Sequence, residues 1–150
     1  MGHSGRRRGF TLIELLITLA IVAALVVLGL QNFRPAQTQA NLNAQVTQTQ
    51  SLAQAVSAYY ATNGCYPETP WTSVSSGFGV APSGIGPYVG GPWPSTQLYG
   101  AFAANGSPVT STGTAYYVGV VSQARWQANG GGDMNAGYTW AVNGQAVPVC

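Results

Sequence analysis

The chain has 150 residues, enough for one domain with an appended segment. It is 46% hydrophobic but only 5% charged, whereas soluble domains carry about 25% charged residues. Three of its five basic residues are consecutive at 6–8, and no basic cluster follows that could neutralise nucleic-acid phosphates. The composition therefore gives no strong nucleic-acid signal, and the high apolar content argues against intrinsic disorder.

A short basic segment precedes a long apolar run. Residues 1–9 contain the three arginines, and residues 10–30 are almost wholly apolar with Glu14 as their one charged residue. As a helix, this run would reach roughly 30 Å, the thickness of the hydrocarbon core of a bilayer. Because the arginines come first, the positive-inside rule predicts a cytoplasmic N-terminus and an exported C-terminal part.

Three ordinary kinds of segment partly fit this pattern. A cleaved secretory signal would have a shorter apolar core followed by a small-residue cleavage site, which the residues after 30 lack. A twin-arginine signal fits Arg7-Arg8 but also needs such a site. A plain membrane anchor explains the length but not Glu14, because a charge in a membrane helix costs about 2.5–3.5 kcal/mol on insertion scales. Alternatively, Glu14 lies near the membrane face and reaches the headgroups.

The junction between the two segments resembles the processing site of type IV prepilins and type II secretion pseudopilins. It reads Gly-Phe-Thr-Leu-Ile-Glu-Leu-Leu at 9–16, with a basic leader before it and an apolar run after it. The resemblance covers residues 6 to 30. It implies that a prepilin peptidase cuts between Gly9 and Phe10 and then methylates the new amine of Phe10.

The same resemblance implies a role for Glu14 in assembly. In filaments of this family, Glu14 of one subunit would lie near the Phe10 amine of a neighbour. An unpaired carboxylate in an apolar bundle is costly, so the opposite charge would set the register of the subunits. The implied partners are further copies of this chain in a helical filament and the inner-membrane pilus assembly machinery. The inner membrane would hold the precursor, and the cell surface would carry the filament.

The helix is expected to continue through residues 31–64 as an amphipathic segment. Its apolar positions recur at steps of three and four, which is the helical period. They are Leu42, Val46, Thr49, Leu52, Ala53, Val56, Tyr59 and Tyr60. Gly64 supplies a C-terminal stop and Pro67 prevents resumption.

Pro35 interrupts this pattern and should kink the helix or remove one hydrogen bond. In filaments of the resembled family, the corresponding stretch can instead lose its regular winding, which would place the flexible part between Gly29 and Pro35. Both readings stay open. The run from Ala58 to Pro67 also resembles the end of the long helix in pilins and pseudopilins.

Residues 65–150 are expected to form a globular, β-rich head. The first part, 65–113, is dense in Gly, Pro and Ser and is typical of loops. The expected strands are 98–104, 114–122, 138–142 and 145–149. Asn143-Gly144 predicts a tight hairpin turn between the last two. The predicted fold class is α+β, a long N-terminal helix packed on a small antiparallel sheet, which is the type IV pilin-like fold.

The two cysteines, Cys65 and Cys150, flank this head. The exported side of a membrane permits disulfides. A bridge between them would stabilise the head by roughly 4–5 kcal/mol in the loop-entropy model, less any strain. The alternative is two free thiols.

Few residues suggest catalysis or a cofactor. Loss of residues 1–9 would leave neither histidine nor lysine, so a serine or cysteine nucleophile would lack an imidazole base. Glu68 and Asp133 could form an acid–base pair, but isolated surface charges are the simpler expectation. Asp133 and Asn135 resemble the opening of a calcium loop, yet no terminal Glu follows, so a Gly-rich turn is expected. No metal and no cofactor is predicted.

Aromatic residues are frequent in the head. They are Trp71, Trp93, Trp126, Trp140, Tyr88, Tyr99 and Tyr138. Such rings could stack on sugars or on single-stranded DNA, but a place in the core is the simpler expectation.

The sequence therefore predicts a structural subunit of an extracellular type IV pilus filament rather than an enzyme. A minor pilin or a type II secretion pseudopilin stays open within the same family, as do adhesion, motility and DNA uptake by the filament. The alternative of another class is a single-pass membrane-anchored binding module, which would retain residues 1–9.

Overall fold

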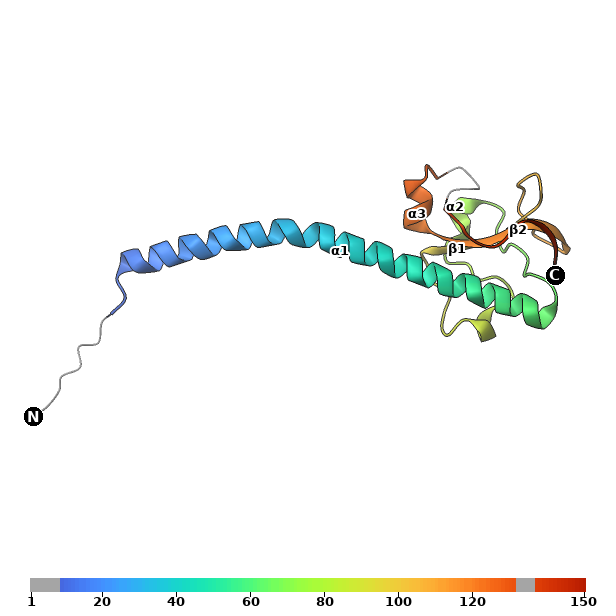
Figure 1. Cartoon of the computed structure of the whole chain (residues 1–150), viewed down its shortest axis with the longest axis horizontal. Coiled ribbons are helices and arrows are strands. Elements are labelled where there is room, and N and C mark those ends of the chain that lie inside the picture. Colours follow the sequence, from blue (N-terminus) through green and yellow to red (C-terminus); the bar gives the residue numbers. More distant parts are fainter. Residues whose placement is uncertain (1–8, 132–136) are drawn as a thin grey trace, which may run out of the picture. The chain divides into compact units, whose positions relative to one another are not determined.

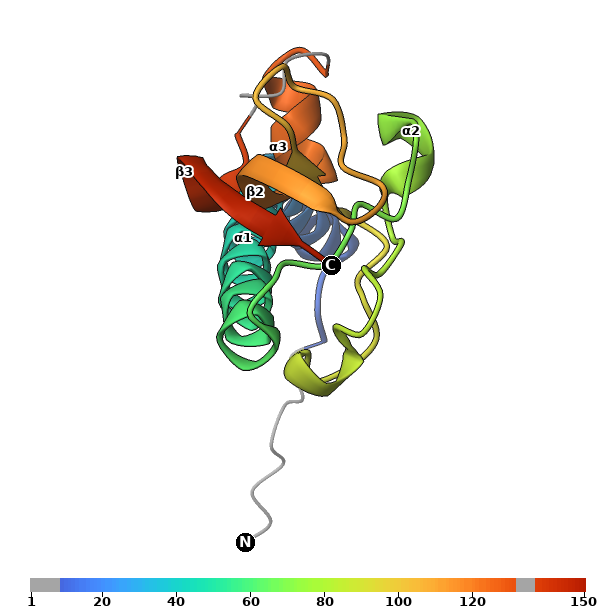
Figure 2. The same cartoon turned by 90° about the vertical axis from the view of Figure 1, so that its right-hand side faces the viewer.

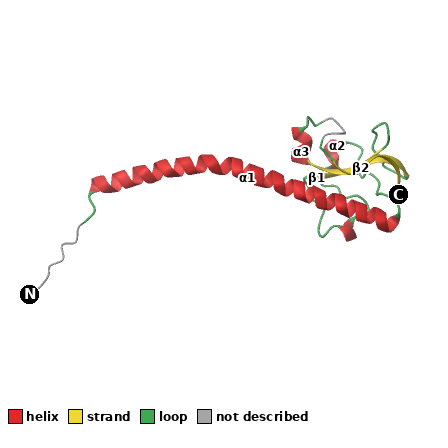
Figure 3. Cartoon of the chain, in the orientation of Figure 1, coloured by secondary structure: helices red, strands yellow, loops and turns green. Residues whose placement is uncertain are grey.

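The computed structural model describes residues 9–131 and 137–150, except for the side chains of 31–34. Figure 1 follows the elements along the chain. They are α1 (Leu12–Asn63), α2 (Val74–Gly77), η1 (Gly86–Tyr88), β1 (Gln97–Phe102), β2 (Gly113–Ser122), α3 (Gln123–Ala128) and β3 (Thr139–Val149). The predicted α+β class, with a long N-terminal helix followed by a small antiparallel sheet, is confirmed (Figure 3).

Contacts divide the chain into two compact units. Met1–Asn41 contains the first part of α1, and Leu42–Cys150 contains its last part together with all other elements. Residues 42–63 therefore belong to the same compact unit as the sheet. We refer to Leu42–Cys150 as the head unit.

The helix α1 runs through Pro35 and ends where the sequence predicts. Pro35 lies inside α1, and the backbone is α-helical from Gly29 onward across it. At the C-terminal end, Gly64 adopts a φ of 75°, which favours glycine, and its N–H donates to the Tyr60 carbonyl at 2.8 Å. This bond satisfies one of the carbonyls that a helix end leaves unpaired.

The three strands form one antiparallel sheet with the order β1-β2-β3. The central strand β2 pairs with β1 in an unbroken register, for example Leu98 with Val121 and Ala101 with Val118. The expected strands at 98–104 and 114–122 are confirmed to within two residues. The connection from β2 to β3 carries α3, a six-residue helix that the sequence analysis did not predict.

The predicted hairpin at Asn143-Gly144 is wrong. Thr139–Val149 is a single strand, and both of its halves pair with β2 rather than with each other. Gly144 does adopt a left-handed φ of 79°, but this conformation serves a bulge. Tyr117 pairs with Asn143 while Ala115 pairs with Val147, so β3 has extra residues at this point. The turn residues therefore bend a strand instead of reversing it.

Alternate side chains of the sheet enter two separate apolar clusters. Tyr99 and Ala101 of β1 join the cluster that contains Leu52 and Val56 of α1. Leu98 and Phe102 point the other way, into a second cluster. Because both faces are covered, β1 is buried along its whole length. Figure 2 shows the last part of α1 along one side of the sheet, with α3 on the other.

The predicted apolar face of α1 is largely buried, with one exception. Thr49, Leu52, Ala53 and Val56 are at most 7% exposed. Leu42, however, is 39% exposed and belongs to neither cluster, so the buried stripe begins after it.

Candidate assembly site

The candidate processing junction precedes the first turn of α1. Gly9 and Phe10 have no assigned helix or strand, and the Phe10 side chain is 78% exposed. Among the described residues, no heavy atom beyond the chain neighbours lies within 4 Å of the position that a Cβ on Gly9 would take.

The first turns of α1 expose apolar side chains on every side. Between Leu12 and Leu30, the large apolar side chains are 52–79% exposed. Within the described residues, α1 is the one helix whose length and composition suit a membrane span, with a mean hydropathy of 2.8 in its most apolar part. A helix that is apolar all round needs lipid or other helices around it.

Glu14 lies in the first turn of this helix. Its N–H donates to the Thr11 carbonyl at 3.1 Å, and the Leu15 N–H donates to the same carbonyl at 3.2 Å. A carboxylate at this end complements the helix dipole. No ion pair to Glu14 exists among the residues that the structure describes.

Residues 4–30 match the family model for the prokaryotic N-terminal methylation motif. Two sequences of the type IV major pilin protein PilE1 of Neisseria gonorrhoeae are each 34% identical to the chain over 84 residues. This stretch of the chain is thus similar in sequence to type IV major pilins. The match covers 55% of the chain and 49% or 45% of the two relatives, so the chain spans about half the length of the curated relatives it matches. No solved structure matches it significantly.

The cysteines join the segment just after α1 to the residue that follows β3. Cys65 and Cys150 form a disulfide, with Cα atoms 5.4 Å apart and a sequence separation of 85. Backbone bonds run alongside it, because the Tyr66 N–H donates to the Pro148 carbonyl and the Cys150 N–H donates to the Tyr66 carbonyl, both at 2.9 Å. The end of β3 is thus tied to the segment just after α1.

Most of the weaker candidate residues lie outside the part of the chain that the structure describes. Glu68 is half-buried beside Thr69, and Asp133 and Asn135 lie outside the described residues. Within the described ranges, no group of three His, Cys, Asp or Glu residues could hold a metal ion. The acid–base pair and the calcium loop therefore stay predictions.

The aromatic residues divide between core and surface. Trp71, Tyr99 and Tyr138 are at most 8% exposed, whereas Trp126 and Trp140 are half-buried. Tyr99 is anchored from both sides: its hydroxyl donates to the Pro67 carbonyl, and its carbonyl accepts from the Trp71 indole, both at 2.6 Å. Burial raises the pKa of Tyr99 well above its usual value.

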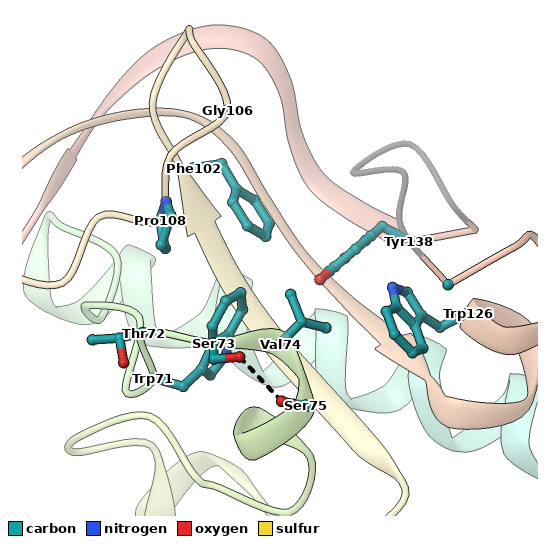
Figure 4. Close-up of a pocket in the computed structure, with 11 residues that line it drawn as sticks. Trp71, Thr72, Ser73, Val74, Ser75, Phe102, Gly106, Pro108, Trp126 and Tyr138 are labelled. Atoms are coloured by element: carbon teal, nitrogen blue, oxygen red, sulfur yellow. Dashed lines mark hydrogen bonds between the residues drawn. The ribbon is translucent and has the colours of Figure 1, made fainter.

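The head also has a pocket that the sequence did not predict, on the face of the sheet opposite α1. Trp71, Phe102, Trp126 and Tyr138 line it, and its volume is about 330 Å³ (Figure 4). Phe102 was not singled out from the sequence, and neither was α3, which carries Trp126. The one local signal for α3 is its N-cap, since the Ser122 hydroxyl accepts from the Arg125 N–H at 3.4 Å.

Proposed function

We propose that this chain is a structural subunit of an extracellular type IV pilus filament. The observation that carries this proposal is the methylation motif at residues 4–30, which ends in a helix with apolar side chains exposed all round. The similarity to type IV major pilins supports a pilus rather than a secretion pseudopilus. The head unit would form the outer part of the filament, and no catalytic step is required of it.

Processing would change the charge at the start of the helix. A prepilin peptidase would cut between Gly9 and Phe10 and remove the three arginines that hold the N-terminus on the cytoplasmic side. The cut would also create a cationic, methylated amine on Phe10. The helix could then leave the inner membrane for a filament without dragging a basic leader through lipid.

The Glu14 carboxylate and the Phe10 amine would direct assembly. Transfer of Leu, Ile and Val side chains from lipid to a bundle of helices exchanges one apolar environment for another, so it discriminates little between registers. An uncompensated carboxylate in such a bundle is costly, and a neighbour's amine removes that cost at one register only. The charged pair would therefore select the register, while the apolar side chains supply packing.

Mass spectrometry of filaments sheared from the cell surface tests this proposal. The expected result is an abundant chain that begins at N-methylated Phe10. A chain that keeps residues 1–9 and stays in the membrane as a monomer would contradict it and would favour a membrane-anchored binding module. Processed chains found only in trace amounts within filaments of another pilin would instead indicate a minor pilin, and retention in a periplasmic pseudopilus would indicate a pseudopilin.

A further inference from the structure

The pocket on the second face of the sheet is built from four separate parts of the head unit. Trp71 and Ser73 come from the segment that leads into α2, Phe102 ends β1, Trp126 belongs to α3, and Tyr138 precedes β3. Its volume of about 330 Å³ lies at the lower end of the roughly 300–1,000 Å³ typical of sites for small ligands.

The aromatic walls of the pocket hold one another in place. Phe102 meets Trp71 and Tyr138 edge to face, with ring centroids 5.9 and 5.6 Å apart. Trp126 is supported in the same manner by Phe78, at 5.6 Å. Such contacts fix ring orientation and add about 0.5–1.5 kcal/mol each. The rings are therefore held in place before any ligand arrives, and the half-buried Trp126 is the most accessible of them.

One buried polar group is aimed into this space. Tyr138 is 8% exposed, and Figure 4 shows its hydroxyl directed between Phe102, Val74 and Trp126. Burial raises the pKa of Tyr138, so the hydroxyl keeps its proton at neutral pH. Among the described residues no hydrogen bond to this hydroxyl is formed, and its oxygen is not fully enclosed, since the buried side-chain polar atom left without a partner among them is Gln45 Oε1. The hydroxyl is therefore available to accept or donate a hydrogen bond to a ligand in this space.

Further hydroxyls lie at the rim of the pocket, and none of the described lining residues carries a charge. The Ser73 and Ser75 hydroxyls are 3.0 Å apart and Thr72 is next to them. The described lining residues include no Asp, Glu, Lys, Arg or His. A phosphate or carboxylate would find no counter-charge there, and single-stranded nucleic acid would lack the cationic groove that follows its backbone. The described lining therefore disfavours an anionic ligand, and its hydroxyls and aromatic side chains suit a neutral ligand with one apolar face and several hydroxyl groups.

We propose that this pocket binds a neutral hexose unit of a carbohydrate. The C–H face of a pyranose would lie against the aromatic walls, and its hydroxyls would meet Tyr138 and the rim serines. The site is independent of filament assembly, because the assembly segment begins at Phe10 and the pocket belongs wholly to the head unit.

Ligand-observed NMR titration of the full chain in detergent micelles tests the proposal. The probes are glucose, galactose, mannose, N-acetylglucosamine and their common disaccharides, with a thymidine oligonucleotide and indole as comparisons. We expect saturable binding of at least one neutral sugar. Tyr138→Phe removes only the hydroxyl and should weaken that binding about fivefold, the value of one neutral hydrogen bond. Trp126→Ala should weaken it tenfold or more, as expected for a lost apolar face of about this size.

Tyr116→Phe is the matched control. Tyr116 is a half-buried tyrosine of β2 that does not line the pocket, so its loss should leave sugar affinity unchanged. The proposal is overturned if no sugar binds, if only indole or the oligonucleotide binds, or if Tyr138→Phe and Tyr116→Phe bind equally well. Filament yield is measured in parallel and should not change in Tyr138→Phe, so a failure of this site is distinguishable from a failure of the pilin proposal.

Discussion

The first and last parts of α1 differ in how far their apolar side chains are buried. From Leu12 to Leu30 its large side chains are exposed all round, whereas Leu52 and Val56 are at most 3% exposed within the head unit. The first part has too few polar residues to be stable in water, and the second has an apolar stripe on an otherwise polar helix. Helical structure is thus common to both, and composition decides whether the apolar side chains of the helix are covered by the head unit or left exposed.

Replacement of Glu14, in the first part of α1, should lower filament yield and leave the stability of the head unit unchanged. We expect Glu14→Ala to lower the yield of sheared filaments at least tenfold, because the subunits lose the charge that selects their register. Unfolding of the head by denaturant should stay unchanged. Glu68→Ala is the control, since it removes a carboxylate of the head unit and should leave filament yield as it is. Equal yields for Glu14→Ala and the unaltered chain would contradict the assembly role.

Removal of the disulfide should destabilise the head unit and leave the N-terminal part of α1 unchanged. The double substitution Cys65→Ser and Cys150→Ser releases a loop closed over 85 positions, for which the loop-entropy model gives a loss of about 4–5 kcal/mol. The measurement is the denaturant midpoint of the chain in micelles. The helicity of the N-terminal unit should persist, because Met1–Asn41 lies outside that loop. An unchanged midpoint would show that the bridge adds nothing to stability.

Substitution of two leucines of α1 can locate the boundary between its exposed part and the part buried in the head unit. Leu52→Ala leaves a cavity in the core and should lower the free energy of unfolding by about 2–5 kcal/mol. Leu42→Ala removes the same atoms from a side chain that is 39% exposed and should cost less than about 1 kcal/mol. Chemical denaturation of the two variants side by side gives the difference. Similar losses would place Leu42 inside the core.

Local patterns predicted local structure and little more. The motif at 9–14 and the stop at Gly64 depend on neighbours in sequence, so both could be recognised there. Asn143-Gly144 predicted left-handed backbone, which is present at Gly144, but the pairing of both flanks with β2 decides between a turn and a bulge. The pocket could not be predicted from the sequence, because only the folded sheet brings Trp71 and Tyr138 together.

Alkaline pH should act on the head and spare the N-terminal helix. Burial raises the pKa of Tyr99 well above its ordinary value of 10.0, and burial raises the pKa of Tyr66 as well. The folded head therefore holds protons that the unfolded chain gives up, so unfolding is favoured as pH rises above 10.0 and the loss continues up to the folded pKa. We expect denaturant midpoints to be constant at neutral pH and to fall above this value. Residues 1–41 contain no tyrosine, so the helicity of that part should not follow the same curve.

The variant Tyr99→Phe tests this cause. Its denaturant midpoint should fall less steeply at alkaline pH, starting from a neutral-pH stability lowered by about 1 kcal/mol for the lost hydrogen bond to Pro67. A fall of equal steepness in both chains would assign the alkaline sensitivity to other groups.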